Sequence, residues 1–224
     1  MRRKPSHSDS DNIASRYSRL VDFTQSPRKL SIMARIIIAG SCLLAVVLLF
    51  ARYSSSQQTT KLRTVAVLKD QGGGSGVWGT IHLEQDISQP NGQPSSPVHI
   101  YGDINGLKST GVHAFHIHKF GDITNGCQSA GDHWNPRAHE HGAPEDVVRH
   151  DGDLGNINAD RSGKAQIDLR DNILTLVGPQ SIIGRSVVVH EKADDLGRGG
   201  TADSKKTGSA GGRLACGVIG WLKE

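Results

Sequence analysis

Short segments in which apolar and polar residues alternate occupy most of residues 64–224. Residues 77–83 read Val-Trp-Gly-Thr-Ile-His-Leu and show the two-residue period of a strand with one buried face. Well-marked turns, such as Ala-Asp-Arg-Ser-Gly at 159–163, separate seven further segments of similar texture. These segments are residues 65–68, 98–105, 112–118, 153–159, 165–169, 187–190 and 218–222. Eight short strands with no amphipathic helix between them predict an all-β fold, an eight-stranded antiparallel Greek-key barrel or sandwich.

Two connections in this β-rich region are too long to be hairpin turns. They run from about residue 119 to 152 and from about residue 191 to 216. Loops longer than about 12–15 residues are uncommon in compact domains and usually have a function. We therefore expect the chemistry of the protein to lie in these two loops.

A different pattern precedes the β-rich region, because residues 36–50 contain no charged side chain. As a helix this run would span roughly 22 Å, which is less than the hydrocarbon core of a bilayer, about 30 Å. Residues 30–51 would be long enough if the Arg35 side chain extends to the headgroups. A buried core helix is the alternative, but no other long amphipathic helix is present to cover it.

The residues before the apolar run are polar, Ser-rich and basic, and we expect residues 1–35 to be disordered or weakly structured. Their positive charge predicts a cytoplasmic N-terminus and translocation of everything after residue 51. The run is then either a retained signal-anchor or a signal cleaved after small residues such as Ser54 and Ser56, and the long basic region before it favours the anchor. The expected organisation is a tail at 1–35, a transmembrane anchor or signal at 36–51, a linker at 52–63 and one domain at 64–224 on the extracellular or luminal side.

The charge distribution changes how the basic pI is interpreted. The chain has a net charge of +4 and a pI of about 9.1. Residues 1–63 contain 11 Lys/Arg and 3 Asp/Glu, whereas residues 64–224 contain 15 and 19. The β-rich domain is therefore mildly acidic, and we expect no nucleic-acid partner.

Histidines are concentrated around the first long loop, with six of the chain's eleven between residues 116 and 150. His116 and His118 are two residues apart on an expected strand, so their rings face the same side of the sheet. Such a pair is often only polar surface. The loop adds histidines and a carboxylate at spacings of 8, 9 and 3 residues, and three nitrogens with one oxygen suit tetrahedral zinc. These four residues are His133, His141, His150 and Asp153. A solvated loop with incidental histidines is the alternative.

Three cysteines occur in the chain. Cys42 lies in the apolar run and is most simply a small hydrophobic residue. Cys127 and Cys216 could form a disulfide in the domain, but their number alone leaves this pairing undecided.

Six segments, in order, resemble the copper/zinc superoxide dismutases. The first two, Gly-Val-His-Ala-Phe-His-Ile-His at 111–118 and Gly-Asp-Ile-Thr-Asn-Gly-Cys at 121–127, are similar to the family's first signature. Segments 129–136 and 149–156 are similar to its zinc loop, and segments 188–197 and 212–220 complete the resemblance, which covers residues 64–222.

The resemblance implies one copper and one zinc ion per subunit, with His133 bridging them. It implies copper ligands His116, His118, His133 and His190, and zinc ligands His133, His141, His150 and Asp153. It further implies that Asp194 connects the outer nitrogens of His116 and His141, that Cys127 and Cys216 form a disulfide, that Arg213 stands at the entrance to the copper, and that the protein is a homodimer.

The implied reaction is the disproportionation of superoxide to hydrogen peroxide and oxygen, with His133 and Arg213 as catalytic residues. Copper can change its oxidation state and zinc cannot, so zinc has a structural role. Because an acidic domain repels superoxide, a local positive region is required, for which Arg213, Lys205, Lys206 and Lys192 are candidates. Three features depart from the family pattern: residues 201–207 lack adjacent glutamates, Lys119 follows the His-x-His pair, and Trp134 stands where phenylalanine is usual.

Two other functions are compatible with a β-sandwich. A protein that stores or transfers copper would be expected to lack a copper ligand or the entrance arginine, and this chain has all of them. An adhesion module would not require the ligand spacing.

Overall fold

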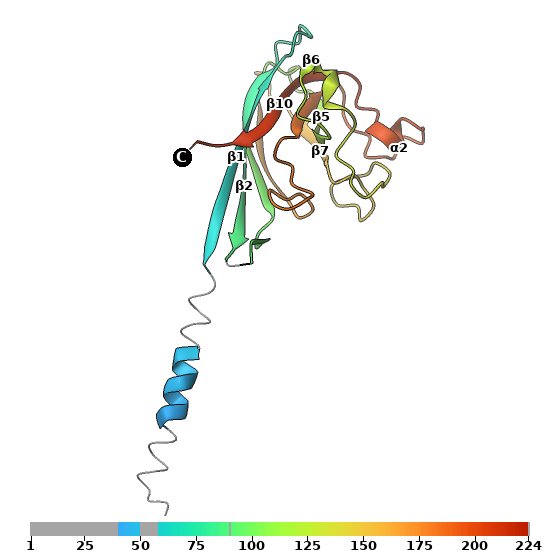
Figure 1. Ribbon diagram of the computed structural model, residues 1–224. Coiled ribbons are helices and arrows are strands. Elements are labelled where there is room, and N and C mark those ends of the chain that lie inside the picture. Colours follow the sequence, from blue (N-terminus) through green and yellow to red (C-terminus); the bar gives the residue numbers. More distant parts are fainter. Residues whose placement is uncertain (1–39, 50–57, 90, 224) are drawn as a thin grey trace, which may run out of the picture. The chain divides into compact units, whose positions relative to one another are not determined.

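The computed structural model describes residues 40–49, 58–89 and 91–223, in two units divided near residue 55 (Figure 1). In the first unit residues 40–49 are helical, and their side chains are exposed. No helix among the described residues is long and apolar enough to cross a membrane. The expected tail at 1–35 and the cleavage candidates Ser54 and Ser56 lie outside the described residues.

The second unit is an antiparallel β-barrel. Nine strands form one sheet in the order β7-β5-β9-β10-β1-β2-β4-β8, with β3 paired to β2. These nine strands are β1 (Thr59–Lys69), β2 (Trp78–Ser88), β3 (Gln93–Pro94), β4 (Val98–Asn105), β5 (Val112–His118), β7 (Asp153–Asn158), β8 (Ala165–Asp171), β9 (Ser186–His190) and β10 (Arg213–Trp221). A tenth short strand, β6 (Thr124–Cys127), lies outside this strand order. Besides a 3₁₀ turn at Gln128–Ala130, the described residues of this unit form one short helix, α2 (Ser204–Thr207). The two ends of the strand order, β7 and β8, contact each other, so the barrel is nearly closed.

The predicted all-β antiparallel fold is confirmed, and each of the eight expected segments overlaps a strand. The boundaries differ by several residues at two places. β1 begins at Thr59, inside the expected linker, because residues 59–63 pair with β2 from Ser88 to Glu84. β10 begins at Arg213, so the second long loop ends before it. The short strands β3 and β6 carry no apolar alternation that would have predicted them.

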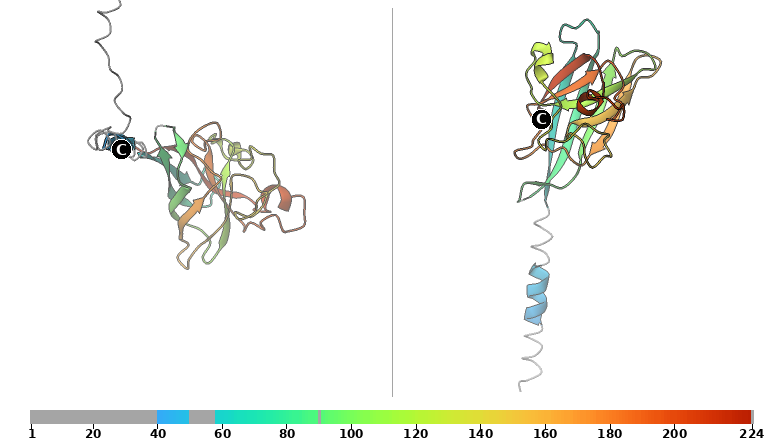
Figure 2. Two further views of the ribbon diagram at one scale, coloured as in Figure 1. Left: turned by 90° about the horizontal axis from the view of Figure 1, so that it is seen from below. Right: turned by 90° about the vertical axis from the view of Figure 1, so that its right-hand side faces the viewer.

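Strand β5 positions the functional side chains because its two faces are both buried. Phe115 and Ile117 point into the main hydrophobic core, together with Ile81, Ile100 and other aliphatic residues of the barrel. The two-residue period puts His116 and His118 on the opposite face, outside the barrel, where they are also fully buried. Figure 2 shows the strands curving around one interior, with the long loops on the outside of the barrel.

Candidate metal centre

Four buried imidazoles converge on the outer face of β5. The ligand nitrogens of His116, His118, His133 and His190 all lie within 4.8 Å of one another. The two strands β5 and β9 supply three of them, and the first long loop brings in the fourth through an isolated bridge between His118 and His133. We call this set the four-imidazole group.

Hydrogen bonds determine which ring nitrogens face the centre of this group. His118 Nδ1 donates to the carbonyl of Gly131 over 2.8 Å, and His190 Nδ1 lies 3.5 Å from the carbonyl of Gly211. A neutral imidazole that donates from Nδ1 has its lone pair on Nε2. The Nε2 atoms of His118 and His190 are nevertheless 3.1 Å apart. Two lone pairs at this distance repel unless a cation lies between them.

His116 leads to the same conclusion from the other side of the group. Its Nε2 is 2.8 Å from Asp194 Oδ2, while its Nδ1 is buried without a hydrogen-bond partner. An unsatisfied buried nitrogen is costly, and metal coordination would satisfy it. The residues therefore fit a cation with nitrogen ligands, and copper accepts such a ligand set.

A second group is centred on the carboxylate of Asp153, which is fully buried. Asp153 Oδ1 is 2.8 Å from His133 Nδ1 and 3.1 Å from His150 Nδ1, and its Oδ2 is 3.0 Å from His141 Nδ1. Three nitrogens and one oxygen in a closed, buried site fit structural zinc. We call this set the Asp153 group.

His133 belongs to both groups. Its Nδ1 faces Asp153, which leaves Nε2 for the four-imidazole group. Its ring centroid is 4.0 Å from that of His116 and 5.4 Å from that of His150. One imidazole can therefore connect two cations.

The pKa shifts follow from burial and from the carboxylates. Burial, reinforced by the neighbouring imidazoles, holds the pKa of His116 and His118 well below the usual histidine range and lowers that of His190 to about 3. Burial also lowers the pKa of His133. For His141 burial acts in the same direction, but hydrogen bonds to Asp153 and Asp194 outweigh it and raise its pKa to about 9. The four-imidazole group is thus neutral at physiological pH, the form in which histidine binds metals.

Asp194 connects the two groups. Its Oδ2 is 2.8 Å from His116 Nε2 and its Oδ1 is 2.8 Å from His141 Nε2. Asn156 clamps the aspartate backbone: the Asp194 N–H donates to Asn156 Oδ1 over 2.7 Å, and Asn156 Nδ2 donates to the Asp194 carbonyl over 2.9 Å. A carboxylate of this kind fixes the orientation of metal-binding rings.

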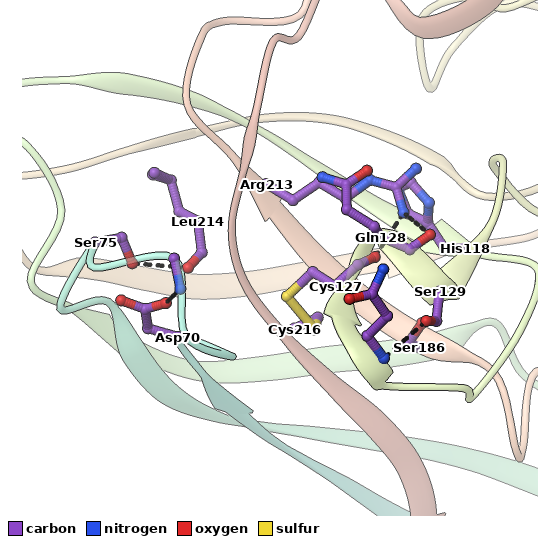
Figure 3. Close-up of a disulfide and its surroundings, with 12 residues drawn as sticks. Asp70, Ser75, His118, Cys127, Gln128, Ser129, Ser186, Arg213, Leu214 and Cys216 are labelled. Carbon is purple, nitrogen blue, oxygen red and sulfur yellow. Dashed lines mark hydrogen bonds between the residues drawn. A yellow bond between two sulfur atoms is a disulfide. The ribbon is translucent and has the colours of Figure 1, made fainter.

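The disulfide between Cys127 and Cys216 joins the end of β6 to β10, so this predicted pairing is confirmed. Figure 3 shows the Arg213 guanidinium directed at the carbonyls beside this disulfide. Arg213 donates from Nη1 to the Cys127 carbonyl and from Nη2 to the Gly131 carbonyl, both over 2.6 Å. The Gly131 carbonyl also accepts from His118 Nδ1, so one peptide group orients both the arginine and a ring of the four-imidazole group.

A cavity of about 330 Å³ opens over the four-imidazole group. Arg213 and Lys206 contribute positive charge to its lining, and Asp132 and Asp203 contribute negative charge. An adjacent hollow of about 450 Å³ is lined by Lys119, Lys205 and Lys206 among others. Lys192 lines neither of these two cavities and packs beside Gly211 instead.

Arg149 is a buried residue to which the sequence patterns assigned no role. Its Nη1 donates to the carbonyls of His150, Asp151 and Asp153, and its Nη2 forms an ion pair with Asp171 of β8. Arg149 therefore attaches the end of the first loop to the barrel. Asn156 was equally unassigned. Both residues lie inside a segment that resembles the family pattern, but only their contacts indicate what they do.

Comparisons with known proteins agree with this chemistry. Residues 77–219 match the family model described as copper/zinc superoxide dismutase (SODC). The curated protein superoxide dismutase (Cu-Zn) 5 of Dictyostelium discoideum is 55% identical over 150 residues, which make up 67% of this chain and 94% of the relative.

The connection through Asp194 can be tested at Gly208, which ends α2. A Cβ at Gly208 would lie 2.0 Å from Asp194 Oδ1 and 2.5 Å from His141 Nε2. We expect Gly208→Ala to break this contact and to weaken zinc binding by about 10- to 100-fold, the usual loss when the partner of a metal-binding histidine is removed. Competition with a chelator measures the zinc affinity.

Gly200→Ala is the matched control. Gly200 has φ +71° and Gly208 has φ +67°, but a Cβ at Gly200 would meet no atom within 4 Å. Both alanines therefore bear a similar backbone strain. Equal zinc affinities in the two variants would show that the contact with Asp194 does not matter.

Proposed function

The chain belongs to the copper/zinc superoxide dismutase family, and we propose how its own side chains convert superoxide to hydrogen peroxide and oxygen. The single observation that carries the proposal is that His133 is shared by two groups of buried ligands. We assign copper to His116, His118, His133 and His190, and zinc to His133, His141, His150 and Asp153. Copper supplies the one-electron redox chemistry when it is bound, and zinc, which has no redox chemistry, is structural.

His133 is the residue that we assign to proton transfer. Its Nδ1 faces the Asp153 group, where zinc would take it, so Nε2 is the atom that can accept a proton and pass it to the peroxide product. Burial lowers the pKa of His133, which makes it a ready proton donor. Since the Nδ1 side of the ring would stay fixed in the Asp153 group, His133 keeps the same orientation after each transfer.

Arg213 is the residue that we assign to binding the superoxide anion. Two carbonyls fix its guanidinium at the edge of the cavity over His118 and His190. Among the described residues no carboxylate forms an ion pair with it, so its charge remains available to an anion. Asp132, which lines the same cavity, raises the pKa of Arg213 but does not outweigh burial, which lowers it. Lys206 adds a second positive charge to the same cavity.

Replacing the charge of Arg213 tests this assignment. We expect Arg213→Gln to lower kcat/KM for superoxide by about tenfold, because a local positive charge raises the encounter rate of an anion by about 10- to 1,000-fold. Arg213→Lys should retain an intermediate rate. Arg170→Gln, which removes an exposed arginine of β8, is the control for a change in net charge.

The parent enzyme should also slow with increasing ionic strength, since salt screens this attraction. A rate that is independent of salt, or an Arg213→Gln variant as fast as Arg170→Gln, would contradict the role of Arg213. Metal-loaded protein without dismutase activity would favour copper storage instead.

We also propose that residues 36–51 anchor the enzyme in a membrane, with the catalytic domain on the extracellular or luminal side. The support is the charge-free run at 36–50, the basic residues before it and the exposed apolar side chains of residues 40–49, such as Leu44 and Leu49. We expect the mature protein to stay in the membrane fraction after carbonate extraction and to keep residues 1–56. A soluble protein that starts near residue 57 would instead show a cleaved signal.

We further propose that two copies associate through the outer face of β1 and β10 beside the disulfide. The support is apolar surface there: Val67 is 52% exposed, and Ile123 and Val218 are half-buried. By contrast Ile219, the next residue of β10, faces the barrel interior and is fully buried. Val67→Glu should shift the sedimentation coefficient of residues 56–224 to that of a monomer, whereas Val112→Glu, at an exposed position of β5, should not. A parent domain that is already monomeric would contradict the proposal.

A further inference from the structure

Trp134, the residue after the bridging histidine, makes contacts that ligand binding alone does not explain. Its N–H donates to the carbonyl of Ile117 over 2.8 Å, and its carbonyl accepts from the N–H of Gly152 over 2.9 Å. Ile117 separates His116 from His118, and Gly152 precedes the aspartate of the Asp153 group. One peptide group of Trp134 is therefore hydrogen-bonded to β5, which carries ligands of the four-imidazole group. The other is hydrogen-bonded to the loop just before Asp153.

The indole ring of Trp134 lies against the guanidinium of Arg185. The Cζ atom of Arg185 is 3.2 Å from the ring centroid. Arg185 is itself held by two carbonyls: Nη1 donates to Lys119 over 2.7 Å, and Nε donates to Ser181 over 3.0 Å. Burial lowers the pKa of Arg185, and no carboxylate opposes this shift. The face of the indole thus takes the place of a negatively charged partner.

This stack restrains the segment that carries His133 from outside the metal groups. Turning the peptide between His133 and Trp134 would break the hydrogen bond from the Trp134 N–H to the Ile117 carbonyl and separate the indole from the guanidinium. Because the Arg185 guanidinium is bonded to the carbonyl of Lys119, directly after β5, it cannot follow the ring. We propose that the stack of Trp134 on Arg185 is a positioning device that holds the His133 ring between the two metal groups.

The proposal rests on the bridging role of His133 proposed above, and it assigns a reason to the indole at residue 134. Phenylalanine, which is usual at this position in the family that the sequence resembles, would keep the apolar packing against the core. Tryptophan has the most favourable ring face for a cation, and a guanidinium can both stack and donate to carbonyls, which an ammonium group cannot do in the same geometry.

Variants of the full chain, loaded with copper and zinc, test the proposal. Zinc release into a colorimetric chelator and the electron paramagnetic resonance spectrum of bound copper are measured in the absence of superoxide. We expect Arg185→Met to accelerate zinc release about tenfold, Trp134→Phe to accelerate it about threefold, and both to change the copper spectrum. Arg185→Lys keeps the charge but loses the planar stack, so it should behave like Arg185→Met.

Arg170→Met and Trp221→Phe are matched controls at exposed positions and should leave both readouts unchanged. The proposal is overturned if Arg185→Met and Trp134→Phe release zinc at the parent rate with the parent copper spectrum. A lower unfolding midpoint with both readouts unchanged overturns it as well, because the stack would then serve only general stability. If Arg185→Met does not fold, the conservative Trp134→Phe decides alone. A parent enzyme without dismutase activity would count against the proposed function and not against this inference, since neither readout depends on turnover.

Discussion

The 3.1 Å approach of His118 Nε2 to His190 Nε2 is the contact on which the rest of the centre depends. The Nδ1 atoms of both rings face backbone carbonyls, so the Nε2 lone pairs face each other. Burial lowers the pKa of His190 to about 3, so this ring is neutral at physiological pH. The contact is therefore favourable only when a cation lies between the two Nε2 atoms. The surrounding strands and loops hold the His118 and His190 rings in this unfavourable arrangement.

Backbone carbonyls restrain the side chains on the copper side. The carbonyl of Gly131 accepts from both His118 and Arg213, and the Cys127 carbonyl, fixed by the disulfide to β10, accepts from Arg213 as well. The disulfide thus acts on the chemistry through a peptide group and not through its sulfur atoms. Because the loop that orients the ring also orients the guanidinium, ligand geometry and anion attraction are coupled through one short segment.

The zinc side is held by charge instead. Asp153 receives three imidazoles, Asp194 connects His141 to the copper side, and Arg149 ties the loop carbonyls to Asp171. Buried charges of this kind are tolerable only when every partner is present. This explains why the ligands are embedded in a larger polar network. Asn156 and the stack of Trp134 on Arg185 belong to this network and are not themselves ligands.

Sequence alone determined the all-β fold, because the alternation of apolar and polar residues indicates which face of each strand is buried. It also determined the set of candidate ligands, because their spacing resembles that of the family. It also established that the basic pI belongs to the N-terminal region and not to the domain. Only the tertiary structure decided which nitrogens converge, that Lys206 and not Lys192 lines the cavity, and that Arg149, Asn156 and Arg185 support the centre. The physical reason is that these roles depend on contacts between residues distant in the chain, such as Arg185 with Trp134. They also depend on main-chain carbonyls, and since every residue has one, the sequence does not show which of them accepts a hydrogen bond.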